Sequence, residues 1–327
     1  MALQKAQHVP VLDSLRAIAA LSVCLYHFVC GPINFISNET VLDVFTFGKY
    51  GVQLFFVISG FIIPWSVYHS DYRISKYFKF LLKRFLRLEP PYLVSIALAL
   101  GILFFRGFYA DLPESRAISA GQVLLHIGYF IPFSSYRWIL DVYWTLAVEF
   151  QFYLFMGLFY FVIISEKIAL RIAGYALVIG LSFIGTRNFL FYWLPVFLLG
   201  NMLFLFLAKR IGKAEFYSMM IILLVQIAVF LPGPVFFSSL IPAAAILYMF
   251  SYSNRILDWI GKISYSIYLL HTIVGTTVIN ILSHHAHSPL TKALVVLAGV
   301  GVSIACSYCM YLFIEKPSKR LSSKIKL

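Results

Sequence analysis

The stretch V-L-D-S-L-R-A-I-A-A-L-S-V-C-L-Y-H-F-V-C, from Val11 to Cys30, decides how this chain folds and where its chemistry lies. It reads as a membrane helix, yet it carries Arg16 and His27, eleven residues apart. At ~100° per residue both side chains point to the same side of the helix, with a rise of ~16 Å between them. An ionisable side chain inside a membrane span costs free energy and indicates a functional site. Because Asp13 lies one turn from Arg16, this face predicts a polar channel for a long ligand.

The composition is that of a multi-pass membrane protein. Hydrophobic residues make up 61% of the 327 residues and charged residues 12%, against about 45–50% and 25% in soluble domains. We therefore expect a single all-α integral-membrane domain over residues 1–327, with no appended soluble domain. The four cysteines lie in or beside apolar segments, so we interpret them as small buried hydrophobes and expect no metal site.

The apolar segments indicate about ten transmembrane helices. A further apolar stretch at 123–133 is too short to span and is broken by Gly128 and Pro132, so we expect it to be interfacial or re-entrant. The ten predicted spans lie at about 11–30, 48–68, 82–105, 142–164, 168–186, 189–208, 216–231, 235–252, 263–283 and 291–314.

The distribution of Lys and Arg predicts the orientation of these spans. With the N-terminus in the cytoplasm, 20 of the 26 basic residues fall in cytoplasmic segments and 6 fall outside. This bias favours ten spans with both termini cytoplasmic. The net charge of +13 then serves topology and contact with anionic lipid, and it does not imply a nucleic-acid partner.

The third predicted span opens with a second basic pattern, F-L-L-K-R-F-L-R-L-E-P-P-Y, from Phe80 to Tyr92. Arg84 and Arg87 are i,i+3 neighbours, so their guanidinium groups face one patch. The planar fork of arginine suits phosphate, because it binds two oxygens at once. Ordinary positive-inside anchoring explains the same pair equally well, and the residues alone leave both interpretations open.

These two patterns and five further blocks, which together mark six segments of the chain because R-x10-H begins inside the first block, resemble the membrane acyltransferase-3 family. A single block recurs by chance in apolar sequence, whereas six blocks in order along the whole chain are specific. R-x10-H in the first span and R-x-x-R in the third carry the resemblance, together with L-D-S-L-R-A-I-A-A-L at Leu12–Leu21, G-V-Q-L-F-F-V-I-S-G-F at Gly51–Phe61, Y-W-T-L-A-V-E-F-Q-F-Y at Tyr143–Tyr153, I-S-Y-S-I-Y-L-L-H at Ile263–His271 and F-I-E-K-P at Phe313–Pro317.

The resemblance implies an enzyme that moves an acyl group, usually acetyl, from cytoplasmic acyl-CoA to a hydroxyl of an extracytoplasmic polysaccharide or glycolipid. Acetyl-CoA would be a donor substrate and not a permanently bound cofactor. The pantetheine arm of CoA is of the same order as the ~16 Å between Arg16 and His27. Arg16, Arg84 and Arg87 would then hold the phosphates, and the thioester would lie near His27. The implied location is a bacterial cell inner membrane.

The chemistry of such a transfer requires a base, because a hydroxyl is a weak nucleophile at neutral pH. We expect His27 to be that base or to accept the acyl group itself, and the sequence leaves both routes open. Glu149 is the one carboxylate inside the fourth span, so it is the candidate for orienting or charging His27 or for binding the acceptor. Asp13 is expected to pair with Arg16 and to play a supporting role.

Other polar residues in the spans have a supporting or structural interpretation. Ser59, Ser264 and Tyr268 line the channel or make helix–helix contacts, and the two interpretations stay open. We interpret His271 as a hydrogen-bonded packing histidine, since its own helix has no arginine one channel length away. Glu315 is expected to pair with basic residues near the cytoplasm and to end its helix.

Two other classes of protein compete with the acyltransferase interpretation. A proton-linked secondary transporter or flippase of a glycan precursor would use His27 and Glu149, but it predicts inverted repeats, and the two halves of the chain show no clear repeat. A membrane scaffold would have no need of the two arginine patterns.

Overall fold

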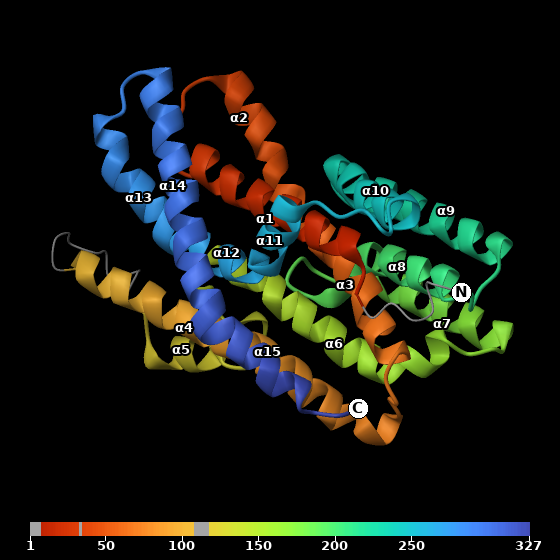
Figure 1. The fold of residues 1–327 in the computed structure, drawn as a ribbon. Helices are drawn as coiled ribbons and strands as arrows, with labels where there is room; N and C mark the ends of the chain where they lie inside the picture. The colour runs from red at the N-terminus through yellow and green to blue at the C-terminus, as the bar shows by residue number, and fades with distance from the viewer. Residues whose placement is uncertain (1–7, 33–34, 108–117) are drawn as a thin grey trace.

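The computed structural model describes residues 8–32, 35–107 and 118–327, and these residues form helices and no strand (Figure 1). The elements are α1 (Pro10–Cys30), α2 (Glu39–Thr46), η1 (Phe47–Tyr50), α3 (Gly51–Tyr68), η2 (Ile74–Lys76), α4 (Tyr77–Gly107), α5 (Ala120–His126), η4 (Ile131–Phe133), η5 (Asp141–Tyr143), α6 (Trp144–Ile163), α7 (Ile168–Leu181), α8 (Leu190–Leu207), α9 (Lys213–Phe230), α10 (Gly233–Tyr248), α11 (Arg255–Lys262), α12 (Ser264–Leu270), η6 (His271–Gly275), α13 (Thr276–Leu282), η7 (Ser283–His285), α14 (Pro289–Met310), η8 (Tyr311–Glu315) and α15 (Lys316–Ser323).

Each of the ten predicted spans coincides with a helix, and in the part of the chain that the structure describes eight helical segments are long and apolar enough to cross a membrane. The two remaining helices, α7 and α10, have 14 and 16 residues. At 1.5 Å per residue such helices reach only ~21–24 Å, short of a hydrocarbon core of ~30 Å. The protein is therefore multi-pass and all-helical, while the count of ten and the orientation of the termini stay predictions.

One helix continues beyond its predicted end through a π-helical turn. The segment that begins with α14 passes through η8 and continues as α15 to Ser323, so the expectation that it ends near residue 314 is wrong. Pro317 stands in the first turn of α15, where a missing N–H costs little. Similarly, Pro90 and Pro91 lie inside the continuous helix α4. In Figure 1 α15 (blue) lies along α4 (orange) and packs against it, while α14 rises away from α4.

The tightest helix pair in the core joins α3 to α8 through glycines. A Cβ atom on Gly60 would overlap the carbonyl of Phe197, and one on Gly200 would overlap the carbonyl of Val57. Without side chains at these positions, the two backbones approach closely, as small residues allow in membrane helix pairs. The Phe197 ring then stacks between Phe56 and Phe152, with centroids 4.6 and 4.3 Å away.

Gly60→Ala should destabilise the protein, because the added methyl group meets backbone that cannot rotate away. We expect a loss of about 1–3 kcal/mol, typical of an overpacked core, seen as a lower unfolding temperature in detergent. Gly101→Ala in α4 is the matched control, because nothing lies within 4 Å of its added Cβ. Equal unfolding temperatures for the two variants would contradict the close α3–α8 contact.

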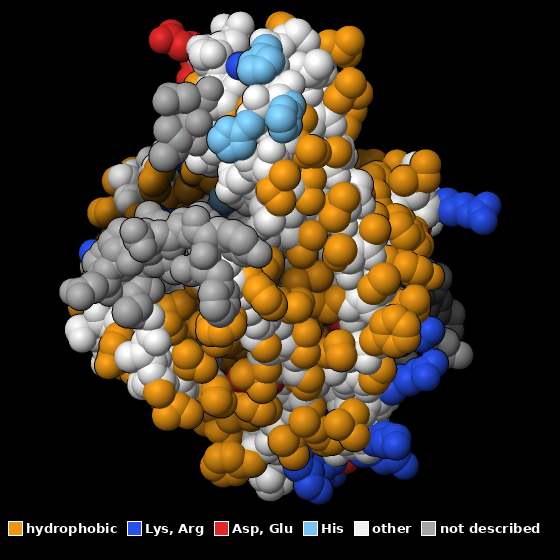
Figure 2. All heavy atoms as spheres, turned by 90° about the vertical axis from the view of Figure 1, so that its left-hand side faces the viewer, with side chains coloured by type: hydrophobic (Ala, Val, Ile, Leu, Met, Phe, Trp, Pro, Cys, Tyr) orange, Lys and Arg blue, Asp and Glu red, His pale blue; other side chains and the backbone are white. Residues whose placement is uncertain are grey.

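The surface agrees with a membrane location. Figure 2 shows hydrophobic side chains over most of one face of the molecule, with Lys and Arg gathered toward its lower end. Exposed leucines, isoleucines and phenylalanines occur on many helices, among them Ile221 on α9 and Leu297 on α14. A soluble protein rarely exposes so large a continuous apolar area. The same side chains are favourable in contact with lipid.

Candidate active site

A cavity of 510 Å³ lies between α1, α3, α4, α6, α12 and the α14–α15 segment. Six basic and three acidic side chains line it, so its walls carry an excess of positive charge suited to an anionic ligand. The charged lining residues are Arg16, Lys83, Arg84, Arg87, Lys262 and Lys319, with Asp13, Glu149 and Glu315.

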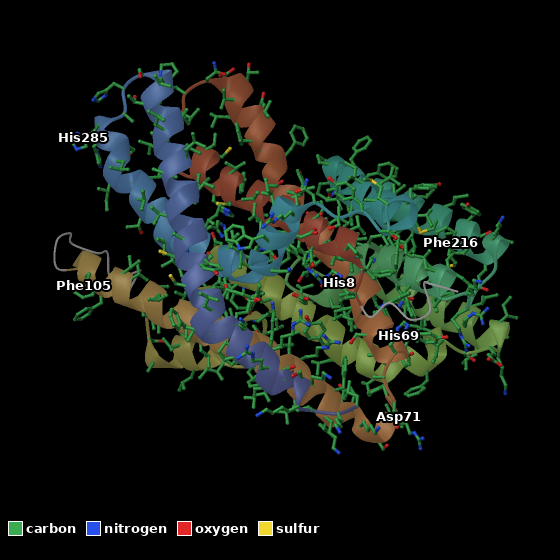
Figure 3. The ribbon with its side chains drawn as sticks, viewed as in Figure 1. His8, His69, Asp71, Phe105, Phe216 and His285 are labelled. Carbon is green, nitrogen blue, oxygen red and sulfur yellow. The ribbon has the colours of Figure 1, made fainter. Side chains whose placement is uncertain are left out.

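Arg16 enters this cavity from α1 with its predicted partner. Its Nη1 lies 3.1 Å from Oδ1 of Asp13, one turn earlier on the same helix. This confirms the expected i,i+3 pair. The other oxygen of Asp13 lies 2.8 Å from Nε2 of His8, which Figure 3 shows close to the start of α1.

Arg84 is the most unusual side chain of the cavity. It is 5% exposed, and its Nε and Nη2 atoms have no hydrogen-bond partner in the part of the chain that the structure describes. Phe80 and Tyr153 pack against the guanidinium, with ring centroids 5.4 and 5.7 Å from its central carbon. Rings can stabilise a cation over their faces, but they do not satisfy N–H donors. A buried guanidinium with unused donors is therefore arranged to receive an anion.

Arg87 lies beside Arg84 and also lines the cavity, as the R-x-x-R spacing predicts. It interacts electrostatically with both Arg16 and Arg84. Three guanidinium groups from α1 and α4 therefore share one end of the cavity. Their mutual repulsion is relieved when an anion binds between them.

Glu149, from α6, faces this arginine cluster and not His27. Its Oε1 accepts hydrogen bonds from Ser59 Oγ at 2.8 Å and from the Tyr153 hydroxyl at 2.6 Å. It interacts electrostatically with Arg16 and Arg84. Among the described residues no hydrogen bond joins it to a histidine. The expected contact with His27 is thus not made, because that face of α6 points to α3 and α4.

Glu315 provides a second buried carboxylate in the cavity. It is fully buried, accepts a hydrogen bond from Ser266 at 2.6 Å and lies 2.5 Å from Nζ of Lys319. The expected pairing with a basic residue is confirmed, although the helix does not end there. Lys319 is thus paired within the protein and does not add an unpaired charge to the arginine cluster.

His27 lies outside this cavity, next to a second histidine. Its Nδ1 is 3.1 Å from Nε2 of His271 and 2.9 Å from the Val23 carbonyl oxygen. His271 is fully buried and hydrogen-bonded, as expected of a packing histidine. Sequence reasoning missed that its partner is His27 itself, 244 residues away. The sequence feature that could have indicated a role for His271 is its position at the end of the I-S-Y-S-I-Y-L-L-H block.

A layer of three side chains separates the histidine pair from the cavity. The cavity reaches Phe55, Thr145 and Tyr268, and neither histidine lines it. The Tyr268 hydroxyl lies 2.7 Å from Thr145 Oγ1, and its ring centroid is 5.8 Å from those of Phe55 and His271. Ser59 and Ser264 also line the cavity, with the Ser264 hydroxyl bonded to the Gly261 carbonyl. Tyr268 thus lines the cavity and also packs against His271 behind it.

A sequence model of the acyltransferase domain family matches residues 9–312, which is nearly the whole chain. The chain belongs to this family. The match confirms the resemblance seen in the motif blocks and the enzyme class that they imply. It also assigns the arginine cavity and the histidine pair to one acyltransferase domain.

Curated relatives of this chain are also named as acyltransferases or O-acetyltransferases. Acyltransferase MdmB of Streptomyces mycarofaciens is 30% identical over 161 residues, 46% of this chain and 39% of the relative. A candidate O-acetyltransferase of Staphylococcus aureus (strain COL) is 31% identical over 162 residues, 46% of this chain and 24% of the relative. A candidate peptidoglycan O-acetyltransferase, YrhL of Bacillus subtilis (strain 168), is 29% identical over 167 residues, 48% and 24% of the two chains. The matches span well under half of each relative, and no solved structure matches.

Proposed function

We propose that this protein is a membrane O-acyltransferase that takes an acyl group, acetyl in the first instance, from acyl-CoA on the cytoplasmic side and transfers it to a hydroxyl of an extracytoplasmic glycan or glycolipid. The observation that carries the proposal is Arg84, a buried guanidinium with unused donors in a cavity that also holds Arg16 and Arg87. The membership of the acyltransferase family supports the reaction class.

The donor binds with its phosphates among the three arginines. CoA carries a pyrophosphate and a further phosphate, and the forked donors of arginine bind two phosphate oxygens at once. Glu149 and Asp13 are the counter-charges of this cluster. Because two carboxylates face three guanidinium groups, the cluster keeps a net positive charge for the ligand. Ser59 and Tyr153 hold that carboxylate in place.

The acyl end of the donor points toward the layer formed by Phe55, Thr145 and Tyr268. The pantetheine arm is long and narrow, so it suits a cavity that runs from the arginines to this layer. Transfer requires the layer to open, because His27 lies behind it. Rotation of Tyr268 away from Thr145 breaks its hydrogen bonds to Thr145 Oγ1 (2.7 Å) and to the Val142 carbonyl oxygen (3.1 Å), and gives the thioester access to the histidine.

His27 takes the proton of the acceptor hydroxyl. The oxygen attacks the thioester carbonyl, the carbon–sulfur bond breaks, and the leaving thiolate receives the proton from the imidazolium. No net proton is gained or lost, so a single histidine suffices. In the second route, the same nitrogen attacks the thioester first and an acyl-histidine is then attacked by the acceptor.

The acceptor class rests on the relatives. One of them is named for peptidoglycan O-acetylation, so a carbohydrate hydroxyl outside the cell membrane is the acceptor that we propose. The multi-pass fold supports the membrane location. The bacterial inner membrane, with the arginine end toward the cytoplasm, is part of the same proposal.

Calorimetry on the purified wild-type protein in detergent tests the donor site. We expect saturable binding of acetyl-CoA and no measurable binding of S-acetylpantetheine, which has the same acyl arm without the phosphates. This difference is expected because the arginine cluster binds the phosphates, which S-acetylpantetheine lacks. Absence of acetyl-CoA binding in a folded preparation would refute the proposed donor and favour a transporter of a glycan precursor.

A further inference from the structure

The fold brings His27 and His271 together by a specific device. His271 opens the π-helical turn η6, a geometry often found at functional sites. At the other end of this turn, a Cβ on Gly275 would overlap the ring of Phe28, the residue after His27. The lack of a side chain at Gly275 therefore lets α1 approach the turn closely. The two imidazole centroids lie 5.0 Å apart as a result.

The backbone around the pair determines which nitrogen of each ring carries the proton. A carbonyl oxygen only accepts hydrogen bonds, so the ring nitrogen facing it must donate. His271 Nδ1 faces the Ile267 carbonyl at 3.1 Å, and His27 Nδ1 faces the Val23 carbonyl at 2.9 Å. Both neutral rings are therefore protonated at Nδ1. It follows that Nε2 of His271 is an acceptor, and it faces the Nδ1–H of His27 at 3.1 Å.

This arrangement leaves one basic atom free. With its proton on Nδ1, His27 has its lone pair on Nε2, and among the described residues no hydrogen bond to that atom is present. The Nε2 atom is thus available to a substrate proton. Nδ1–H is shared between a carbonyl and a neighbouring imidazole, as in catalytic histidines whose second nitrogen is held by another group.

Resting on the function proposed above, we propose that His271 is the positioning residue for His27: it accepts the Nδ1–H bond, aims Nε2 at the acceptor hydroxyl and stabilises the imidazolium formed during transfer. When Nε2 takes the substrate proton, the positive charge strengthens the existing bond to His271. Because His271 is locked with its own proton toward Ile267, it does not compete by donating. His271 itself neither gains nor loses a proton.

Acidic and aromatic groups around the pair fit this role. Asp141, on η5, is the carboxylate that interacts electrostatically with His27, and it is solvent-exposed. No carboxylate contacts His27 directly among the described residues, so the neutral acceptor His271 takes the place of the acid found in many catalytic pairs. Tyr26 also packs edge-on against the His27 ring, with the ring centroids 4.9 Å apart.

The test compares three substitutions of His271 in the full-length protein. His271→Gln keeps an acceptor oxygen close to the position of Nε2, His271→Asn has its oxygen one bond nearer the backbone, and His271→Leu has no acceptor. We expect kcat for acetyl transfer to fall ~10- to 100-fold in the Leu and Asn variants, the usual effect of losing a hydrogen bond to a charged group. The Gln variant should keep most of the wild-type kcat. KM for acetyl-CoA should stay unchanged in all three variants.

Unfolding temperature and calorimetric binding of acetyl-CoA, measured on each variant, separate folding from catalysis. His285→Leu, on the exposed tip labelled in Figure 3, is the control expected to keep full activity. If folded Leu and Asn variants kept the wild-type kcat, or Gln were no better than Asn, His271 would not be a positioning residue. Failure of the underlying acyltransferase proposal is recognised separately, because the wild-type protein would then neither bind acetyl-CoA nor transfer the acetyl group.

Discussion

His27→Ala should abolish acyl transfer while leaving acetyl-CoA bound. A positioned general base contributes about 10²–10⁴-fold to such reactions, and a nucleophile that forms a covalent intermediate contributes at least as much. His27 does not line the arginine cavity, so its removal should not change the affinity for the phosphates. The measurements are turnover of radiolabelled acetyl-CoA with a glycan acceptor and calorimetric binding of acetyl-CoA, made on the same preparation.

His285→Ala is the matched control, because that histidine is exposed at the far tip of the α13–α14 hairpin. It should keep wild-type turnover. Full activity of His27→Ala would overturn the assigned mechanism. Comparable loss of turnover and of acetyl-CoA binding would show instead that His27 supports the structure of the donor site.

The same protein distinguishes the two chemical routes. Wild-type protein is incubated with radiolabelled acetyl-CoA without acceptor and then quenched. Label retained on the chain, and lost in His27→Ala, would assign the acyl-carrier route. A chain free of label, in a preparation that is active once acceptor is added, would assign the general-base route.

The double substitution Arg84→Ala/Arg87→Ala should remove most of the affinity for acetyl-CoA. Each charged contact to phosphate is worth ~1–3 kcal/mol, and every 1.4 kcal/mol is about tenfold in Kd. Together the two substitutions should therefore weaken binding by at least ~25-fold. The expected pattern in turnover experiments is a raised KM for acetyl-CoA, because the arginines contact the phosphates far from the reacting bond.

The unfolding temperature of the double variant provides a second test of the same prediction. Arg84 is a buried cation whose Nε and Nη2 donors are unsatisfied among the described residues, so its removal relieves a desolvation cost. We expect the unfolding temperature of the double variant without ligand to be no lower than that of wild type. Lys79→Ala, an exposed cation on the same helix, is the control and should leave binding intact. Unchanged affinity in the double variant would exclude the arginine cavity as the donor site.

Local periodicity explains why part of the site was predictable. Arg16 and Asp13 are one turn apart on a helix, so their ion pair follows from helical geometry alone. Arg84 and Arg87 share one face for the same reason. The ten helices were also predictable, because apolar runs of this length have few alternatives in a membrane. Helix ends near proline were not, since the π-helical turn before α15 accommodates Pro317.

Contacts between helices could not be predicted in this way. Glu149 was the candidate for orienting or charging His27 or for binding the acceptor, and the packing of α6 against α3 and α4 places it with the arginines. His271 was interpreted as a packing residue, and its bond to His27 depends on the close approach that Gly275 permits. Which face of a helix meets which neighbour depends on the shapes of many side chains and on small residues distant in the chain.

The sequence by itself determined that this protein is a helical membrane acyltransferase with a basic patch and a histidine on its first helix, because hydrophobicity, helical spacing and motif order are properties of short segments. Only the tertiary structure decided that Nε and Nη2 of Arg84 have no hydrogen-bond partner among the described residues, that Tyr268 lies between the cavity and His271, and that His271 contacts His27. These are contacts between residues up to 244 positions apart. They arise when helices pack, because the close fit of side chains then determines which buried polar groups find a partner.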